Sequence, residues 1–163
     1  MNVTIIGDSN GTKAAEQEKK KIFDIVNKYK LQPYIRFLGY QPHSVLIKEA
    51  YKHHVFLTPS VTSSDGDTEG GAPVTILEMM ATGMPVISTT HCDIPQIITH
   101  GETGLLAEER DVEGLVTNLQ WLLDNYEQWA LMTGKGRQHI ETNFDASTQA
   151  HKLAEIYQQV CIA

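Results

Sequence analysis

Short apolar runs alternate with longer amphipathic segments along most of this chain. Runs rich in β-branched and apolar residues, bounded by glycine, proline or polar residues, predict buried strands over 3–6, 34–38, 55–57, 85–88 and 104–106. The intervening segments have apolar residues at helical spacing and predict helices over 13–30, 44–52, 73–82 and 94–98. This alternation is typical of an α/β fold, in which a parallel sheet is covered by helices on both faces. In such sheets, ligands bind beyond the carboxyl ends of the strands.

The last third of the chain is predicted to be helical. Asp111 is expected to begin an amphipathic helix with the apolar stripe Val112, Leu115, Val116, Leu119, Leu122 and Leu123. The tail to Val160 is expected to continue as helix, with breaks near Gly134-Lys135-Gly136 and near Asn143.

Composition narrows the class of protein. The chain has 163 residues, which is within the usual range of a single domain with its own core. A formal net charge of −7 argues against a nucleic-acid surface, which would normally be basic. Two cysteines do not form a disulfide framework, and the sequence has neither a membrane-spanning apolar run nor a secretory signal. These features favour a cytoplasmic protein, with peripheral attachment to a membrane left open for the full-length form.

The segment around Pro73 carries the strongest chemical signal. Pro73 suits the first position of a helix, and Gly83 suits the left-handed residue after its last turn. Gly70 and Gly71 leave the backbone uncovered beside the helix N-terminus, where amides without intrahelical partners carry partial positive charge. The sequence therefore predicts a site for a phosphate or for a polar face of a sugar. The two glycines could instead only form a turn.

A single carboxylate, Glu78, lies within the apolar turns of this helix. A glutamate in such surroundings has lost some hydration and needs a hydrogen-bonding partner. The alternative is an ordinary solvated glutamate on a helix surface.

Several spaced pieces of the chain form an ordered pattern. They are Ala81-Thr82-Gly83-Met84-Pro85-Val86, Asp93-Ile94-Pro95-Gln96-Ile97-Ile98, Gly101-Glu102-Thr103-Gly104-Leu105-Leu106, Gly7 with Asp8, and Phe37-Leu38-Gly39-Tyr40. Together with the segment from Glu69 to Glu78, this pattern resembles the family 4 glycosyltransferases, retaining enzymes of the GT-B fold. The resemblance covers about Val3 to about Tyr157. It implies a Rossmann-like parallel sheet with helices on both faces, the carboxyl-terminal half of a GT-B fold.

The resemblance also implies roles for individual residues. Glu69 would be the catalytic-site glutamate that contacts the hydroxyls of the transferred sugar, and Glu78 would accept from the two ribose hydroxyls. The donor-binding residues would be Gly39, Tyr40, Gln41, Gly70, Gly71, Ala72, Pro73, Val74 and Glu78. Of these, the loop of Gly39, Tyr40 and Gln41 would hold the nucleobase, although it could also be a plain strand-to-helix turn.

The spacing of the two glutamates departs from the family. The family usually has seven residues between them, whereas eight separate Glu69 from Glu78. Either the turn contains one extra glycine, or Glu69 is not in the usual place and is an ordinary loop charge.

The resemblance further implies that parts of the enzyme are not in this sequence. In the family, an earlier strand and a turn with an arginine and a lysine hold the donor diphosphate, and a separate amino-terminal domain binds the acceptor. We therefore expect residues 1–163 to be a donor-binding domain truncated at its start, with a helical tail from about residue 111. Alone, it is not expected to be a competent catalyst.

Other motifs favour simpler interpretations. Asp65-Gly66-Asp67 has the spacing of a metal-binding aspartate pair in another glycosyltransferase class, but it follows a polar run instead of a strand, so no metal site is expected. His53-His54 and His91-Cys92-Asp93 lack zinc-site spacing and are interpreted as locally hydrogen-bonded. Gly7-Asp8-Ser9-Asn10-Gly11 lacks a full phosphate-loop pattern and reads more simply as a turn.

The sequence thus predicts the donor-binding part of a retaining glycosyltransferase. The parent enzyme would transfer a hexose from a nucleoside diphosphate sugar to a glycan or lipid-linked acceptor, without a cofactor and without a nucleic-acid partner. Two alternatives remain open at this stage. One is a non-catalytic nucleotide-sugar-binding module, and the other is a fragment of a GT-B sugar-nucleotide 2-epimerase.

Overall fold

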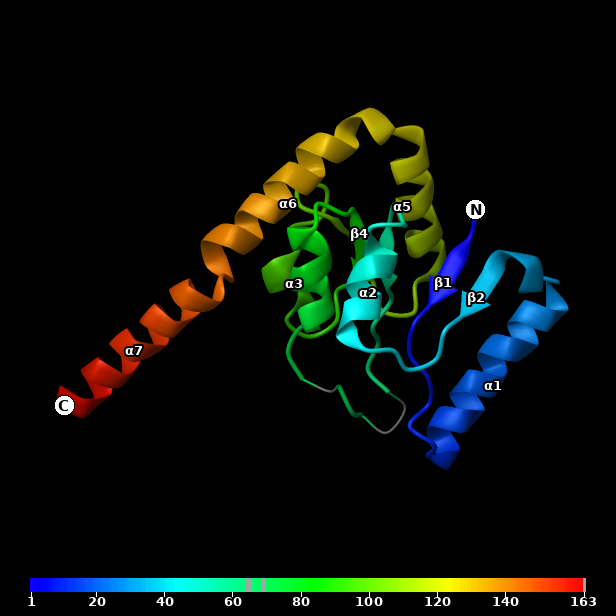
Figure 1. The fold of residues 1–163 in the computed structure, drawn as a ribbon, viewed down its shortest axis with the longest axis horizontal. Helices are drawn as coiled ribbons and strands as arrows, with labels where there is room; N and C mark the ends of the chain where they lie inside the picture. Colours follow the sequence, from blue (N-terminus) through cyan, green and yellow to red (C-terminus); the bar gives the residue numbers. More distant parts are fainter. Residues whose placement is uncertain (64–65, 69, 163) are drawn as a thin grey trace. The chain divides into compact units, whose positions relative to one another are not determined.

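The computed structural model describes residues 1–63, 66–68 and 70–162 and divides the chain into two compact units, Met1 to Glu49 and Ala50 onward (Figure 1). Every strand ladder among these residues is parallel. The strands are β1 (Val3–Ile5), β2 (Ile35–Phe37), β3 (Phe56–Thr58), β4 (Val86–Thr89) and β5 (Leu105–Ala107). β1 pairs with β2 in the first unit, and the order in the second unit is β3-β4-β5. The predicted α/β class with parallel strands is confirmed.

The first unit consists of β1, β2 and three helices. The helices are α1 (Lys13–Lys28), the 3-10 turn η1 (Gln32–Tyr34) and α2 (His43–Ala50), which crosses the unit boundary. Thr12 caps α1 by accepting a hydrogen bond from the Ala15 amide at 3.3 Å. Phe23 of α1 stacks on Phe37 of β2 with ring centroids 4.7 Å apart. This stacking joins the helix to its two-stranded sheet.

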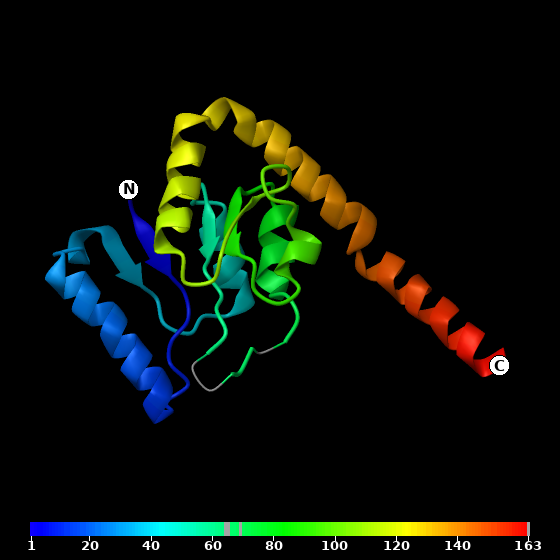
Figure 2. The ribbon, with the colours of Figure 1, turned by 180° about the vertical axis from the view of Figure 1, so that it is seen from behind.

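The second unit has its core around β4. All four residues of β4 are buried, and Ile87 packs in a cluster with Leu105, Leu122 and Met132. Burying a side chain of this size stabilises the fold by about 1.5–3 kcal/mol. The helices of this unit are α3 (Val74–Ala81), α4 (Ile94–Ile97), α5 (Val112–Asp124), the turn η2 (Tyr126–Gln128), α6 (Trp129–Asn143) and α7 (Ala146–Ile162). Figures 1 and 2 show the three-stranded sheet between α3 and α5, and α3 packs against α6.

The ends of α3 agree with the sequence to within one residue. Pro73 has extended backbone angles (φ −61°, ψ 129°) and is the N-cap residue, so its prediction as the first helical residue was wrong by one position. Gly83 has φ +81°, which confirms its left-handed conformation after the last turn.

The predicted break at Gly134-Lys135-Gly136 was wrong, because α6 runs through it. A Cβ atom built on Gly136 would lie 2.9 Å from the Thr103 carbonyl oxygen, so this glycine allows a loop to approach the helix closely. The break near Asn143 is confirmed, since α6 ends there and α7 begins at Ala146.

The apolar stripes of the later helices are only partly buried. In α5, Asp111 caps the helix by accepting from the Gly114 amide at 2.8 Å, as predicted. Leu122 is buried, whereas Val112, Val116 and Leu123 are exposed, so the predicted stripe is wider than the face that packs. In α7, the exposed apolar side chains are Leu153, Ile156, Tyr157 and Val160.

Within the described part of the chain, no helix combines the length and the apolar character needed to cross a bilayer.

The two glycines of α6 offer a matched test of this packing. Gly136→Ala is expected to lower the free energy of unfolding by about 1–3 kcal/mol, because the new methyl group meets a backbone carbonyl. Gly134→Ala meets nothing within 4 Å and should raise stability by up to about 1 kcal/mol through helix propensity. Urea unfolding of both variants measures the difference. Equal effects of the two substitutions would contradict the close approach at Gly136.

Candidate functional site

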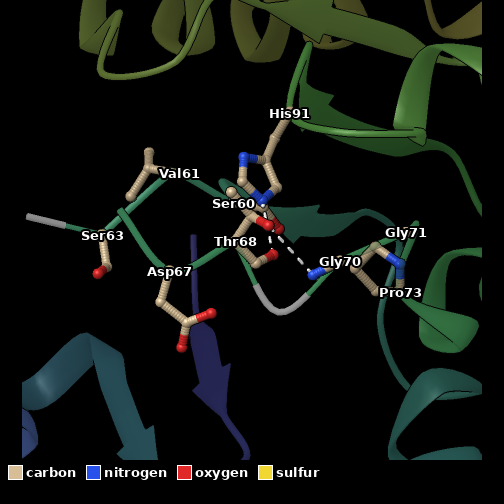
Figure 3. A pocket seen from close by; sticks show the side chains of 9 residues that line it. All are labelled: Ser60, Val61, Ser63, Asp67, Thr68, Gly70, Gly71, Pro73 and His91. Atoms are coloured by element: carbon tan, nitrogen blue, oxygen red, sulfur yellow. Dashed lines mark hydrogen bonds between the residues drawn. The ribbon is translucent and has the colours of Figure 1, made fainter. Parts of the chain in front are cut away.

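A pocket of about 420 Å³ lies in the second unit, beyond the carboxyl end of the sheet (Figure 3). The described residues that line it are Ser60, Val61, Ser63, Asp67, Thr68, Gly70, Gly71, Pro73 and His91. All except His91 belong to the segment that joins β3 to α3, and His91 follows β4. The pocket is therefore where an α/β sheet is expected to bind a ligand.

The start of this segment is attached to β4 by buried hydroxyl groups. Ser88 donates from Oγ to the Thr58 carbonyl at 2.8 Å, and Thr89 donates from Oγ1 to the Ser60 carbonyl. Both side chains are fully buried. Because a buried hydroxyl without a partner would be costly, these bonds fix how the chain leaves β3.

The carboxylate of Glu109, two residues after β5, holds the next part of the segment. It accepts from the Thr62 amide at 2.8 Å and from the Thr62 hydroxyl at 3.1 Å. Arg110 adds a hydrogen bond to the Thr62 carbonyl at 2.5 Å, and its guanidinium lies 3.6 Å from Glu109. Thr62 is thus held through both its backbone and its side chain.

His91 connects Glu109 to the far end of the same segment. Its Nδ1 lies 2.6 Å from Glu109 Oε1, and its Nε2 lies 3.2 Å from the Thr68 carbonyl oxygen. Figure 3 shows the imidazole pointing toward Thr68. Only 5% of His91 is exposed, whereas 25% of the Glu109 side chain is accessible to solvent.

The pair shifts the titration of both partners. The hydrogen bond to Glu109 raises the pKa of His91 above its usual 6.5, against the opposing effect of burial, and the Thr68 carbonyl adds to the rise. The bond from His91, followed by that from the Thr62 amide, lowers the pKa of Glu109 below its usual 4.5. Both shifts favour the charged forms of the two groups, as the 2.6 Å contact between them would.

Glycines at the end of the segment expose backbone next to α3. Gly70 and Gly71 have φ values of +63° and +61°, which few other residues adopt without strain. The Gly70 amide donates to Thr68 Oγ1 at 3.3 Å. Pro73 follows at the N-cap, so the pocket opens onto the helix end that attracts anions.

The structure brings only some of the predicted residues to this pocket. Gly70, Gly71 and Pro73 line it, whereas Glu78, Ala72 and Val74 are not among the described lining residues. Glu78 lies within α3 and is half-buried, consistent with its apolar surroundings. Glu69 falls outside the described residues, so its role stays a prediction.

The predicted nucleobase loop lies in the first unit. Gly39 has φ +63° and its carbonyl accepts from the Gly7 amide at 2.9 Å. Gln41 donates from its side chain to the Leu38 carbonyl at 2.6 Å, and Tyr40 is exposed. Gly39 also lines a pocket of about 490 Å³ between α1 and the β1–β2 sheet. A base-binding role for these three residues remains a prediction.

The turn Gly7-Asp8-Ser9-Asn10-Gly11 uses its side chains locally. Asp8 pairs with Lys19 at 2.6 Å, and Asn10 accepts from the Thr12 amide at 3.1 Å just before α1. The bond to Lys19 lowers the pKa of Asp8. These contacts support the interpretation as a turn.

Sequence reasoning missed Glu109 and Thr62 and interpreted His91 as only locally bonded. Thr62 and Glu109 are 47 positions apart, and His91 and Glu109 are 18 apart, so no local motif links them. One signal was available. Thr90-His91 and Glu108-Glu109 each follow a predicted strand, and the carboxyl ends of parallel strands lie at the same edge of a sheet.

Comparison with known proteins identifies the family of the chain. The family model described as "Glycosyl transferases group 1" matches residues 1–139. Among curated proteins, the amylovoran biosynthesis glycosyltransferase AmsK of Erwinia amylovora is 33% identical over 130 residues, which are 80% of this chain and 32% of that protein. The putative colanic acid biosynthesis glycosyltransferase WcaL of Salmonella typhimurium is 29% identical over 143 residues, 87% of this chain and 35% of that protein. The chain thus spans about a third of the length of these relatives.

Solved structures share the fold. Anabaena Alr3699/HepE, solved in complex with UDP, matches with a TM-score of 0.84 at 17% identity, over 98% of this chain and 41% of that one. Sucrose-phosphate synthase from Thermosynechococcus elongatus matches with a TM-score of 0.81 at 23% identity, over 98% of this chain and 38% of that one. The architecture is that of GT-B glycosyltransferases.

Metal binding at the pocket can be tested directly. Asp65 lies outside the described residues, and among those described no three His, Cys, Asp or Glu residues are grouped to hold a metal ion. A chelator is therefore expected to leave the melting temperature and nucleotide binding unchanged. A rise in melting temperature with Mn²⁺ or Mg²⁺ that Asp67→Asn abolishes would restore the metal interpretation.

Proposed function

Because the chain belongs to the group 1 glycosyltransferases, we propose that it is the carboxyl-terminal, donor-binding part of a retaining family 4 enzyme. The parent enzyme transfers a hexose from a nucleoside diphosphate sugar to a glycan or lipid-linked acceptor. The matched relatives are about two and a half times as long as this chain, so the acceptor site is assigned to a part of the protein outside it. By itself, the chain binds the donor and transfers no sugar.

The observation that carries this proposal is the pocket at the amino end of α3. Gly70 and Gly71 bring uncovered backbone to the helix terminus, where first-turn amides have no intrahelical acceptor. A diphosphate or a sugar hydroxyl face placed there would be bound by backbone donors and by the helix dipole. The same donors would stabilise the negative charge of the departing diphosphate, so the proposed chemistry uses neither metal nor cofactor.

The relatives support the choice of ligand and acceptor. Anabaena HepE was solved in complexes with UDP and with UDP-glucose, and its fold matches 97–98% of this chain. AmsK and WcaL are described as acting in amylovoran and colanic acid biosynthesis, which supports a glycan product.

A cytoplasmic location is part of the proposal and accords with the free thiols of Cys92 and Cys161.

Individual roles follow from this assignment. Glu78 accepts from the two ribose hydroxyls, because a carboxylate offers acceptors without competing donors. Glu69 contacts the hydroxyls of the transferred sugar. Gly39, Tyr40 and Gln41 hold the nucleobase, with the exposed Tyr40 ring available for stacking.

A binding screen of nucleoside diphosphates and their hexose derivatives tests the function. Saturable binding supports a donor site, and absence of binding across the panel would contradict it. The competing hypothesis of a non-catalytic module predicts the same binding by this chain. It is distinguished by a transfer assay on the full-length protein, in which the module transfers nothing.

The substitution Glu78→Gln tests the placement of the ribose. The amide has no charge and presents donors to hydroxyls that already donate, so affinity for the nucleoside diphosphate is expected to fall ten- to a hundredfold, about 1.5–3 kcal/mol. A 2′,3′-dideoxy nucleotide should lose almost nothing, because it has no hydroxyls for Glu78 to bind. Calorimetry with both ligands on both proteins completes the cycle.

A matched control for this cycle is Glu155→Gln in α7, where the residue is exposed. It should leave both affinities unchanged. Equal losses of the ribo and dideoxy ligands in Glu78→Gln would show that Glu78 acts elsewhere than at the ribose.

A further inference from the structure

His91 and Glu109 connect, through hydrogen bonds, the chain segments that follow the three neighbouring strands β3, β4 and β5. Glu109 follows β5 and bonds to Thr62, which follows β3. His91 follows β4 and bridges Glu109 to the Thr68 carbonyl. Thr68 lies two positions before Gly70 and bonds to its amide, so the imidazole is connected to the pocket glycines through one residue.

The bridge requires a doubly protonated imidazole. The carboxylate and the carbonyl are both acceptors, and only the imidazolium has an N–H on each nitrogen. When one proton leaves, the remaining N–H stays on Nδ1, because the Glu109 carboxylate is the stronger acceptor. The lone pair of Nε2 then faces the Thr68 oxygen at 3.2 Å and the Cys92 sulfur at 3.3 Å, so the hydrogen bond to the Thr68 carbonyl is lost.

We propose that His91 and Glu109 are positioning residues for the donor, which hold Thr62 and Thr68 so that Gly70 and Gly71 are presented to the diphosphate sugar. This inference rests on the proposed function of the pocket. Neither residue needs to touch the reacting atoms, since both act through the segment that joins β3 to α3. Donor affinity therefore depends on the protonation of His91.

The direction of the pH dependence follows from the shifts of the pair. The pKa of His91 is raised, so its contribution is complete below about 6.5 and is lost as pH rises through the higher value of the folded protein. The pKa of Glu109 is lowered, so its contribution is complete above about 4.5 and is lost only as pH falls through its lower folded value. The bridge is strongest between these limits.

Other titratable and charged groups lie near the imidazole, and their effect on the pH profile must be distinguished from that of His91. They are Cys92, whose Sγ lies 3.3 Å from Nε2, Asp67 in the pocket wall, Glu108 bonded to Thr90, and Arg110 beside Glu109. Cys92→Ala removes a thiol that contacts both His91 Nε2 and the Thr68 carbonyl oxygen, and Asp67→Asn neutralises a carboxylate of the pocket wall.

The first test is the pH profile of donor affinity. The ligand is a nucleoside diphosphate sugar, because its phosphates lack the ionisation near pH 6 of a terminal phosphate. From about pH 5.5 to 8.5, the wild-type affinity is expected to fall about tenfold in one step above pH 6.5. His91→Gln cannot titrate and should bind about as weakly as wild type at high pH, with a flat profile. Glu109→Gln should lose the same step.

A control variant shows whether the step in affinity belongs to His91. His100→Gln replaces another histidine of the unit, whose Nδ1 accepts from the Leu106 amide at 2.9 Å and which does not line the described pocket. It should retain the wild-type profile. In Cys92→Ala and Asp67→Asn the step should persist, even where the affinity itself changes because these residues contact the bridge or line the pocket. A flat wild-type profile, or a step that persists in His91→Gln, would overturn the inference.

The second test needs no ligand. In NMR spectra, the Thr68 carbonyl carbon and the Gly70 amide should titrate together with the ring of His91, and both titrations should vanish in His91→Gln. If the ring titrates and Thr68 does not respond, the bridge does not position the segment, and the inference fails whatever the ligand does. If Thr68 responds as expected but no nucleotide sugar binds at any pH, the proposed function fails and the bridge itself stands.

Discussion

β4 lies between β3 and β5, with its backbone paired on both sides and all four side chains buried. Its residues alternate between two faces, so Ile87 enters the core while Ser88 reaches the Thr58 carbonyl. A shift of one residue would turn each of these side chains to the opposite face. The burial of β4 therefore sets the register of its sheet and, with it, the position of the loop contacts at its carboxyl end.

The register of β4 also determines which residues meet at the candidate site. Thr89 ends β4 and bonds to Ser60, and His91 follows two residues later at the same edge of the sheet. Glu109 reaches this edge from β5 and takes three hydrogen bonds from Thr62 and His91. Contacts from two strands thus hold a segment whose described residues, between β3 and α3, form neither helix nor strand.

The sequence predicted the elements well wherever local patterns decide them. Apolar runs predicted the five strands found among the described residues, and the caps Asp111 and Gly83 behaved as expected. Errors arose where packing between distant segments overrides local preference. α6 continues through Gly136, where the missing side chain lets the Thr103 carbonyl approach the helix, and Val116 stays exposed although it lies on the predicted stripe.

The site was predictable only in part, for the same reason. Gly70 and Gly71 could be identified because a glycine pair before a helix has a local meaning. The partnership of His91 with Glu109 could not, because it depends on which parallel strands are neighbours. The order β3-β4-β5 is a property of the folded sheet.

The central claim is that the segment from Ser60 to Pro73, held by β4 and β5, binds the diphosphate of a sugar donor at the amino end of α3. Amide chemical-shift mapping on the 163-residue chain, titrated with a panel of nucleoside diphosphates, tests it most directly. The account predicts saturable shifts at Gly70, Gly71, Val74 and Thr75. Saturable shifts that leave these four amides unchanged, and fall elsewhere in the chain, would contradict it.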